Sequence, residues 1–219
     1  FDEAFSAYIV QFNFAEIVTY TAADVHPPFY YWVLKVWTML FGTSEIAFRS
    51  MSVLFGAGAI VAAYLLARRF FGRLIGGVSL LFLVLSPMLI RYSDEARMYT
   101  LAAFIILIAS HVLVKATELN KRRYWILYGI LVSLGMWTHY FTALAWLAHW
   151  AWRAFVIRKS TTKPKLFWRK FFTKNWIIAH VIAVGLFLPW LPFMAIQLGG
   201  IQGGGFWIPP ISVDSFPND

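Results

Sequence analysis

Long apolar runs, separated by short polar and charged segments, dominate the chain. Crossing the hydrocarbon core of a bilayer as a helix takes about 20 mostly apolar residues, and several runs approach or reach that length. They cover residues 46–67, 74–90, 98–114, 124–137, 141–157 and 176–196. The pattern predicts an all-α fold, a polytopic transmembrane helix bundle of about six spans.

Composition and charge support this interpretation. Hydrophobic residues make up 60% of the chain and charged residues 13%, whereas a soluble domain has about 45–50% and about 25%. All but four of the 19 basic residues fall in alternate connections between the runs, where only one of the ten acids, Glu118, joins them. The four exceptions are Lys35, Arg49, Arg91 and Arg97. By the positive-inside rule the basic connections are cytoplasmic, so the net charge of +9 needs no nucleic acid partner.

A further apolar run, residues 27–41, is too short to be assigned as a span. A helix of about 15 residues is about 22 Å long. If it crossed, residues 1–24 would be cytoplasmic, although they contain acids and no Lys or Arg. We therefore predict an interfacial helix within a first extracytoplasmic loop, residues 1–45. The bundle follows at 46–196, and 197–219 begin a further outer loop. Since the chain starts at Phe1 and stops in a Pro-rich stretch, we expect it to be part of a longer protein.

Charged residues also gather at the outer boundary of the bundle. Arg91, Asp94, Glu95 and Arg97 lie within seven residues between two spans. Ionisable groups near hydrocarbon are costly and are functional candidates, but a solvated turn with self-paired charges is an alternative interpretation. His26 and His139 lie at the same boundary. A phosphate or a metal is one role for such residues, and interfacial hydrogen bonding is the more common one. Cysteine is absent, which excludes disulfides and cysteine-ligated zinc.

Short motifs add a resemblance through their order and spacing. They are Asp2-Glu3, His26-Pro27-Pro28, Phe48-Arg49-Ser50, Leu85-Ser86-Pro87, Tyr92-Ser93-Asp94-Glu95-Ala96-Arg97-Met98-Tyr99, Trp137-Thr138-His139-Tyr140-Phe141 and Leu188-Pro189-Trp190. With them the chain resembles the dolichyl-phosphate-mannose protein mannosyltransferase-like family of the C-type (GT-C) membrane glycosyltransferases. The resemblance implies an inverting transfer of a sugar from a polyprenyl-phosphate donor to a protein, lipid or glycan acceptor outside the membrane. We expect an integral protein of a prokaryotic plasma membrane, with membrane lipids as further partners.

The resemblance also implies roles for individual residues. A carboxylate can take the proton from an acceptor hydroxyl as general base, and the resemblance assigns this to Asp2, with Glu3 and Glu95 as further catalytic acids. Arginine suits a lipid phosphate because its planar fork binds two oxygens. The substrate-binding candidates are Arg91, Arg97, Asp94, His26, Tyr99 and His139. No cofactor is required, and if a divalent cation is bound, Glu3 and His26 are its expected ligands.

Two other functions remain open at this point. A transporter or flippase of a lipid-linked anionic substrate would use the same charged outer loop, but the near absence of acids inside the spans counts against it. A non-catalytic membrane subunit would keep the motifs only as parts of the fold.

Overall fold

The computed structural model describes the backbone of residues 2–200 and the side chains of residues 3–199, and this part of the chain is helical with no strand. In chain order the helices are α1 (Asp2–Ile9), α2 (Phe14–Ala23), α3 (Phe29–Phe41), α4 (Glu45–Val84), α5 (Pro87–Ser93), α6 (Tyr99–Leu119), α7 (Arg122–Thr138), α8 (Thr142–Ser160), α9 (Pro164–Phe171), α10 (Lys174–Phe187), the 3₁₀ turn η1 (Leu188–Trp190) and α11 (Leu191–Gly200). The all-α prediction is confirmed.

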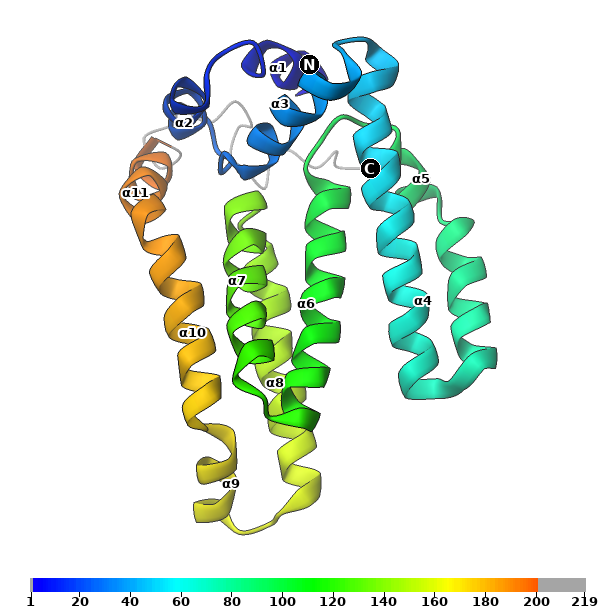
Figure 1. Ribbon diagram of the computed structural model, residues 1–219, viewed down its shortest axis with the longest axis vertical. Coiled ribbons are helices and arrows are strands. Elements are labelled where there is room, and N and C mark those ends of the chain that lie inside the picture. The colour runs from blue at the N-terminus through cyan, green and yellow to red at the C-terminus, as the bar shows by residue number, and fades with distance from the viewer. Residues whose placement is uncertain (1, 201–219) are drawn as a thin grey trace, which may run out of the picture.

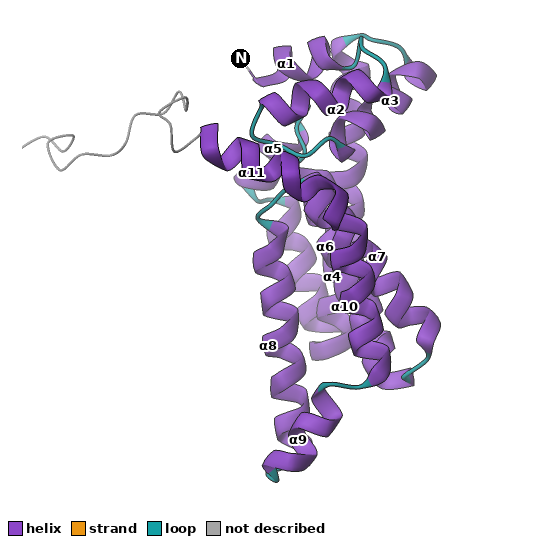
Figure 2. Cartoon of the chain, turned by 90° about the vertical axis from the view of Figure 1, so that its left-hand side faces the viewer, coloured by secondary structure: helices purple, strands orange, loops and turns teal. Residues whose placement is uncertain are grey.

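The helices form a bundle with a cap at one end. Helices α4, α6, α7, α8 and α10 run along the long axis of the molecule (Figure 1). Helices α1–α3, which we call the cap, lie together at one end, and α9 lies at the opposite end in both views (Figures 1 and 2). The short apolar run 27–41 thus forms a cap helix, α3, and not another member of the bundle.

Helix α4 contains two antiparallel limbs, which account for two of the predicted spans. The chain reverses at Gly72, whose φ of +87° lies in a region that glycine adopts without a steric penalty. The second limb ends at Val84, short of the predicted end at residue 90. Ser86 caps the next short helix, α5, by accepting a hydrogen bond from the Leu89 N–H, and Pro87 fills its first position. Proline has no N–H to continue the preceding helix, so the chain restarts there.

The last predicted span is also divided. Helix α10 ends at Phe187, a 3₁₀ turn containing Pro189 follows, and α11 continues to Gly200. Helix α11 lies beside α2 of the cap (Figure 1). Most of the predicted outer segment 197–219 falls outside the described residues.

In the part of the chain that the structure describes, three helical segments are long and apolar enough to cross a membrane by length and composition: α4, α6 and the stretch Lys174–Gly199. Large apolar side chains on the outside of the bundle remain uncovered, among them Leu74, Phe82 and Leu144, which are all more than half exposed. Such a surface is stable in hydrocarbon and not in water. The apolar exterior therefore matches a bilayer as solvent.

The interior of the bundle is built around α7, which packs against α6 on one side and α10 on the other. A Cβ added at Gly129 of α7 would lie 2.3 Å from the Ala179 carbonyl oxygen of α10, so glycine permits the close approach of these two helices. A second apolar cluster, which includes Ile9, Leu34 and Met51, joins the cap to the upper part of the bundle.

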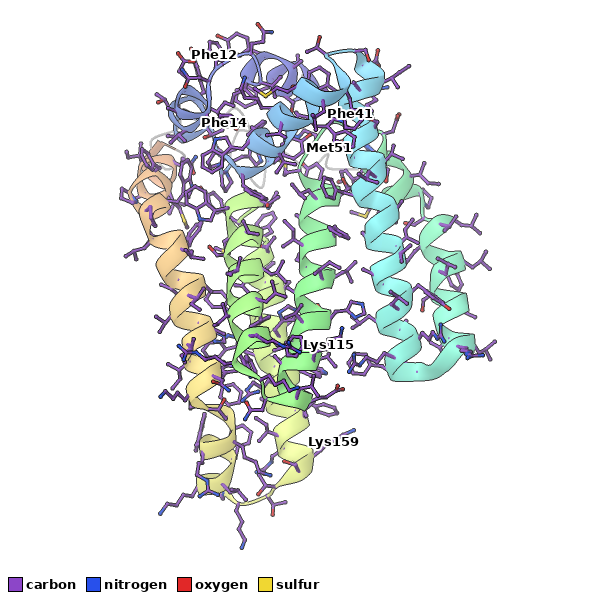
Figure 3. All side chains as sticks on the ribbon, in the orientation of Figure 1. Phe12, Phe14, Phe41, Met51, Lys115 and Lys159 are labelled. Atoms are coloured by element: carbon purple, nitrogen blue, oxygen red, sulfur yellow. The ribbon has the colours of Figure 1, made fainter. Side chains whose placement is uncertain are left out.

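The predicted basic connections lie together at the end opposite the cap, which we call the basic end. Arg69, beside the turn of α4, pairs with Glu118 near the end of α6. Asn175 of α10 donates to the Asn120 carbonyl between α6 and α7. Figure 3 places Lys115 and Lys159 towards this end and Phe12 and Phe14 at the cap. The charge asymmetry of the sequence is thus an asymmetry of the folded molecule, and which end faces the cytoplasm stays a prediction.

Candidate functional site

The first helix of the cap is fastened to the loop between α5 and α6 through a single residue. The Ala96 N–H donates to Oε1 of Glu3 over 2.9 Å. On its other side, the Ala96 carbonyl accepts from the Ser6 hydroxyl over 3.0 Å. Glu3 and Ser6 lie one turn apart on α1, so the helix binds both the N–H and the carbonyl of Ala96. Arg97, a candidate from the sequence, follows directly.

Glu3 is held from the other side by Arg49 of α4. The guanidinium donates from Nε to Oε1 over 3.2 Å and from Nη2 to Oε2 over 3.0 Å. The hydrogen bonds from Arg49 have the largest effect and lower the pKa of Glu3; burial raises it, and the Ala96 N–H and the charge of Arg49 lower it further, so the pKa is lowered overall. Arg49 also pairs with Glu45 at 2.9 Å and approaches Asp94 to 3.8 Å. Glu3 is therefore an ionised positioning residue that joins α1, α4 and the loop.

The segment between α2 and α3 carries an acid and a histidine in contact. Nδ1 of His26 lies 3.0 Å from Oδ2 of Asp24, and both side chains are partly buried. Burial raises the pKa of Asp24, but the hydrogen bond and charge of His26, the Val25 N–H and the charge of Arg97 outweigh it and lower the pKa overall. An ionised Asp24 holds the proton of His26 on Nδ1. The other ring nitrogen, Nε2, is then free to accept a proton when the ring is neutral.

Arg97, Tyr99 and His139 complete this site from two further segments. Arg97 is only 7% exposed, and its guanidinium carbon lies 5.8 Å from the ring centre of Tyr99. The ring of His139 lies 5.9 Å from Tyr99 and 5.8 Å from His26. Segments that are far apart in sequence thus place four candidates from the sequence, His26, Arg97, Tyr99 and His139, in one cluster under the cap, and Asp24 joins them.

The electrostatics of this cluster keep His139 neutral. Burial lowers its pKa to about 4, and the charges of His26 and Arg97 act in the same direction. The Phe141 N–H donates to Nδ1 of His139 over 3.2 Å. A neutral ring that accepts at Nδ1 carries its proton on Nε2, so His139 offers one N–H donor to a ligand.

A chain of side-chain hydrogen bonds lies beside the cluster. Nε1 of Trp190 donates to the Tyr140 hydroxyl over 2.7 Å, and that hydroxyl donates to Gln197. The Gln197 amide donates to the Thr21 carbonyl over 2.7 Å. This chain of contacts connects the turn after α7 with α11 and α2, and it closes the cap against the end of α10.

The remaining candidates lie apart from the cluster. Arg91 is 77% exposed in its side chain and pairs with Glu95 one turn later, at 3.1 Å. Asp94 faces outwards near Arg49. Asp2 is the first residue of α1, but its side chain lies outside the described residues. Two residues of the site, Asp24 and Arg49, are not among the candidates taken from the sequence. The position of Asp24 two residues before His26 is the signal that points to it.

Glu3 and His26 stay the predicted ligands if a divalent cation is bound. Within residues 3–199, no group of three or more His, Asp or Glu side chains is arranged to hold a metal ion. The carboxylate of Glu3 is already occupied by Arg49 and Ala96.

An apolar groove of about 380 Å³ runs along one face of α3. Its lining is Phe14, Phe29, Trp32, Val33, Val36, Trp37 and Leu40. The α3 members recur every three or four residues, which is the spacing of one helical face. Trp32 also stacks on Trp137 at 5.8 Å, two residues before His139. The groove therefore starts beside the polar cluster and leads away from it.

Comparison with known proteins gives one match. The family model of dolichyl-phosphate-mannose-protein mannosyltransferases matches residues 25–193. The matched range contains His26, residues 91–99 and His139, whereas Asp2, Glu3 and Asp24 precede it. No curated protein and no solved structure matches the chain.

We predict that Glu3→Gln lowers the melting temperature in detergent by about 2–4 °C, because it removes the charge that Arg49 and the Ala96 N–H share. The matched control is Glu45→Gln. Glu45 pairs with the same arginine from an exposed position, so its replacement should hardly change the melting temperature. Equal shifts for the two variants would show that Glu3 does not hold the cap in place.

The neutral state of His139 predicts a pH dependence of stability. The unfolded ring binds a proton near pH 6.5 and the folded ring only near pH 4, so stability should fall as the pH is lowered from about 6.5 to about 4. Asp24 has a lowered pKa, so its contribution is lost only below about pH 3.8. In His139→Asn, which keeps an acceptor for the Phe141 N–H, thermal unfolding should be less sensitive to pH between 6.5 and 4. An unchanged pH profile in this variant would contradict the prediction.

Proposed function

Because the chain belongs to the dolichyl-phosphate-mannose-protein mannosyltransferase family, a family of membrane glycosyltransferases, we propose that it transfers a sugar from a polyprenyl-phosphate donor to an acceptor, with inversion. The observation that carries the proposal is the convergence of Arg97, His26, Tyr99 and His139 under the cap. We place the reaction on the extracytoplasmic side, in accordance with the basic connections at the opposite end.

In this proposal Arg97 binds the phosphate of the donor. A lipid phosphate leaving the sugar develops negative charge, which prearranged cations and N–H donors stabilise. Arg97 is buried, so its charge acts in a medium of low dielectric, where the attraction is stronger than in water. The N–H of neutral His139 adds a donor, and we assign Tyr99, whose ring lies next to Arg97, to contact with the sugar. Arg91, which is exposed and paired with Glu95, is an outer contact.

We further propose that Asp2 is the general base. Its neighbour Glu3 is fixed by Arg49 and Ala96, so the first turn of α1 has a defined position next to the loop that carries Arg97. A carboxylate there takes the proton of an acceptor hydroxyl while the oxygen attacks the anomeric carbon and the phosphate leaves. Glu3 is ionised but occupied, so we assign it to positioning. Glu95 and the exposed Asp94 are assigned to the acceptor side of the site.

The apolar groove on α3 is the proposed seat of the prenyl tail nearest the phosphate. Phe29 at its start lies three residues after His26. All seven lining residues are apolar or aromatic, which suits a hydrocarbon chain. A tail lying there would hold the phosphate near Arg97 while the rest of the chain extends into the bilayer.

We predict that Asp2→Asn lowers the kcat of transfer by roughly 10²–10⁴-fold, while donor affinity is retained. The measurement is sugar release from radiolabelled polyprenyl-phosphate mannose, glucose and arabinose by the full-length protein in lipid. The matched control is Glu16→Gln in α2, which removes a carboxylate from the cap but keeps an acceptor for the Asn13 N–H. Its activity should equal that of the wild type. Binding without turnover of any donor by the wild type would favour a transporter, and neither binding nor turnover would favour a non-catalytic subunit.

We predict that Val36→Glu raises KM for a long-chain donor by roughly tenfold, because a charge in the groove is incompatible with hydrocarbon. The kcat should change little, and a donor with a very short prenyl chain should be nearly unaffected. Met39→Glu on the same helix is the control, since Met39 is exposed and does not line the groove. Equal effects of the two variants on KM would remove the groove from the proposal.

A further inference from the structure

The basic end carries a short helix that is fastened rigidly to the bundle. Arg153 of α8 is 3% exposed and donates to the carbonyls of Lys170 and Phe171, at 2.9 Å and at 3.0 and 3.2 Å. Its guanidinium also lies 4.9 Å from the Trp125 ring centre. A cation at the C-terminal end of a helix satisfies its last carbonyls and complements its dipole. Helix α9 is therefore a fixed part of the bundle.

Helix α9 presents three different faces. Phe167 and Phe171 turn inwards and pack in the lower core of the bundle. Trp168 stacks on Phe172 with ring centres 5.7 Å apart and an angle of 11°, and Trp168 is 56% exposed. Lys165 and Arg169 are exposed and lie four residues apart, which places them on one side of the helix. The outward surface thus combines an aromatic pair with a row of cations.

The charge around α9 is of one sign. No Asp or Glu occurs between residues 153 and 174. The exposed cations of this region are Arg158, Lys159, Lys163, Lys165, Arg169, Lys170 and Lys174. Within residues 3–199 none of them makes an ion pair, whereas Arg49, Arg69 and Arg91 all do. Figure 3 shows long side chains reaching outwards from this end of the molecule.

We propose that this surface, formed by the end of α8, by α9 and by the start of α10, docks on the anionic headgroups of the bilayer that the bundle spans. Indole and phenyl rings favour the boundary between hydrocarbon and headgroups, and lysine and arginine side chains bind the phosphates above it. An aromatic pair next to apolar bundle helices fits a lipid surface better than a nucleic acid or an acidic protein. The rigid attachment by Arg153 means that binding sets the depth of the whole bundle. This proposal does not depend on the transferase reaction.

The experiment uses vesicles of phosphatidylcholine mixed with phosphatidylglycerol, in which either the phosphatidylcholine or the phosphatidylglycerol is brominated, and vesicles of phosphatidylcholine alone. Bromine quenches the fluorescence of nearby tryptophans. The quenching of the wild type minus that of Trp168→Phe therefore measures lipid contact at Trp168. Wild-type protein should show this contact with brominated phosphatidylglycerol in clear excess over brominated phosphatidylcholine. The protein should also melt at a higher temperature with the anionic lipid, and 1 M salt should reduce both effects by screening.

Lys165→Gln with Arg169→Gln tests the cations, since neither side chain makes a hydrogen bond or ion pair within the described residues. Each basic side chain near the surface contributes roughly fivefold to binding, so the pair should weaken the preference for phosphatidylglycerol roughly tenfold or more. The control is Arg122→Gln with Arg123→Gln, which removes the same charge at the same end and leaves α9 unchanged, and it should weaken the preference clearly less than the α9 pair does. Melting in phosphatidylcholine alone verifies that both variants are folded.

Three results would overturn the proposal. One is equal quenching of Trp168 by brominated phosphatidylcholine and phosphatidylglycerol. Another is an equal loss of the preference in the two double variants. The third concerns inorganic phosphate: adding it to the protein in phosphatidylcholine vesicles would raise the melting temperature as much as phosphatidylglycerol does. That result would assign the surface to a free anion and not to a lipid.

Discussion

The candidate site depends on the two hydrogen bonds between α1 and the backbone of Ala96. Glu3 and Ser6 hold the two backbone groups of one loop residue, and Arg49 holds Glu3 in turn. The next residue is Arg97, which is thereby turned under the cap instead of outwards like Arg91 and Asp94. A buried arginine is costly unless its surroundings are polar. The segment between α2 and α3 supplies Asp24 and His26, and the bundle supplies Tyr99 and His139. Cap, loop and site are therefore one structural unit.

The two ends of the bundle treat charge in opposite ways. At the cap, acids and bases pair with one another, within one segment as in Asp24–His26 and Arg91–Glu95, or between segments as in Glu3–Arg49. At the basic end the cations of α9 and its neighbours are exposed and have no acids near them in the sequence. Ion pairs stabilise contacts within a protein, whereas a surface whose charges are all of one sign attracts molecules of the opposite charge. The first arrangement suits a binding site, and the second suits a membrane surface.

The site also combines groups with opposed electrostatic states at close range. Asp24 stays ionised because His26 and Arg97 favour its charge, while His139 stays neutral because burial and the same two neighbours disfavour a further positive charge. The site therefore provides fixed cationic charge and neutral N–H donors together. Such an arrangement stabilises an anion without taking its proton, which is what a departing lipid phosphate needs.

The sequence by itself determined the fold class and the distribution of charge. The length and apolar character of the runs require helices in a bilayer, because every backbone polar group must be satisfied within the segment there. Motif order also identified His26, Arg97, Tyr99 and His139 as candidates, one by one. Local spacing explains the Arg91–Glu95 pair, which is one helical turn apart.

Only the tertiary structure decided which candidates meet. His26, Arg97 and His139 lie on three segments separated by tens of residues, and nothing in their local patterns records the distances between them. The same holds for Glu3 with Arg49 and for Arg153 with the end of α9. The sequence predicted a connection between residues 67 and 74, where α4 reverses at Gly72. It could not show that Ser86 and Pro87 divide the following span, since an apolar pattern indicates which residues contact lipid and not where one helix ends and the next begins. Contacts between distant segments follow from packing, and packing is a property of the whole chain.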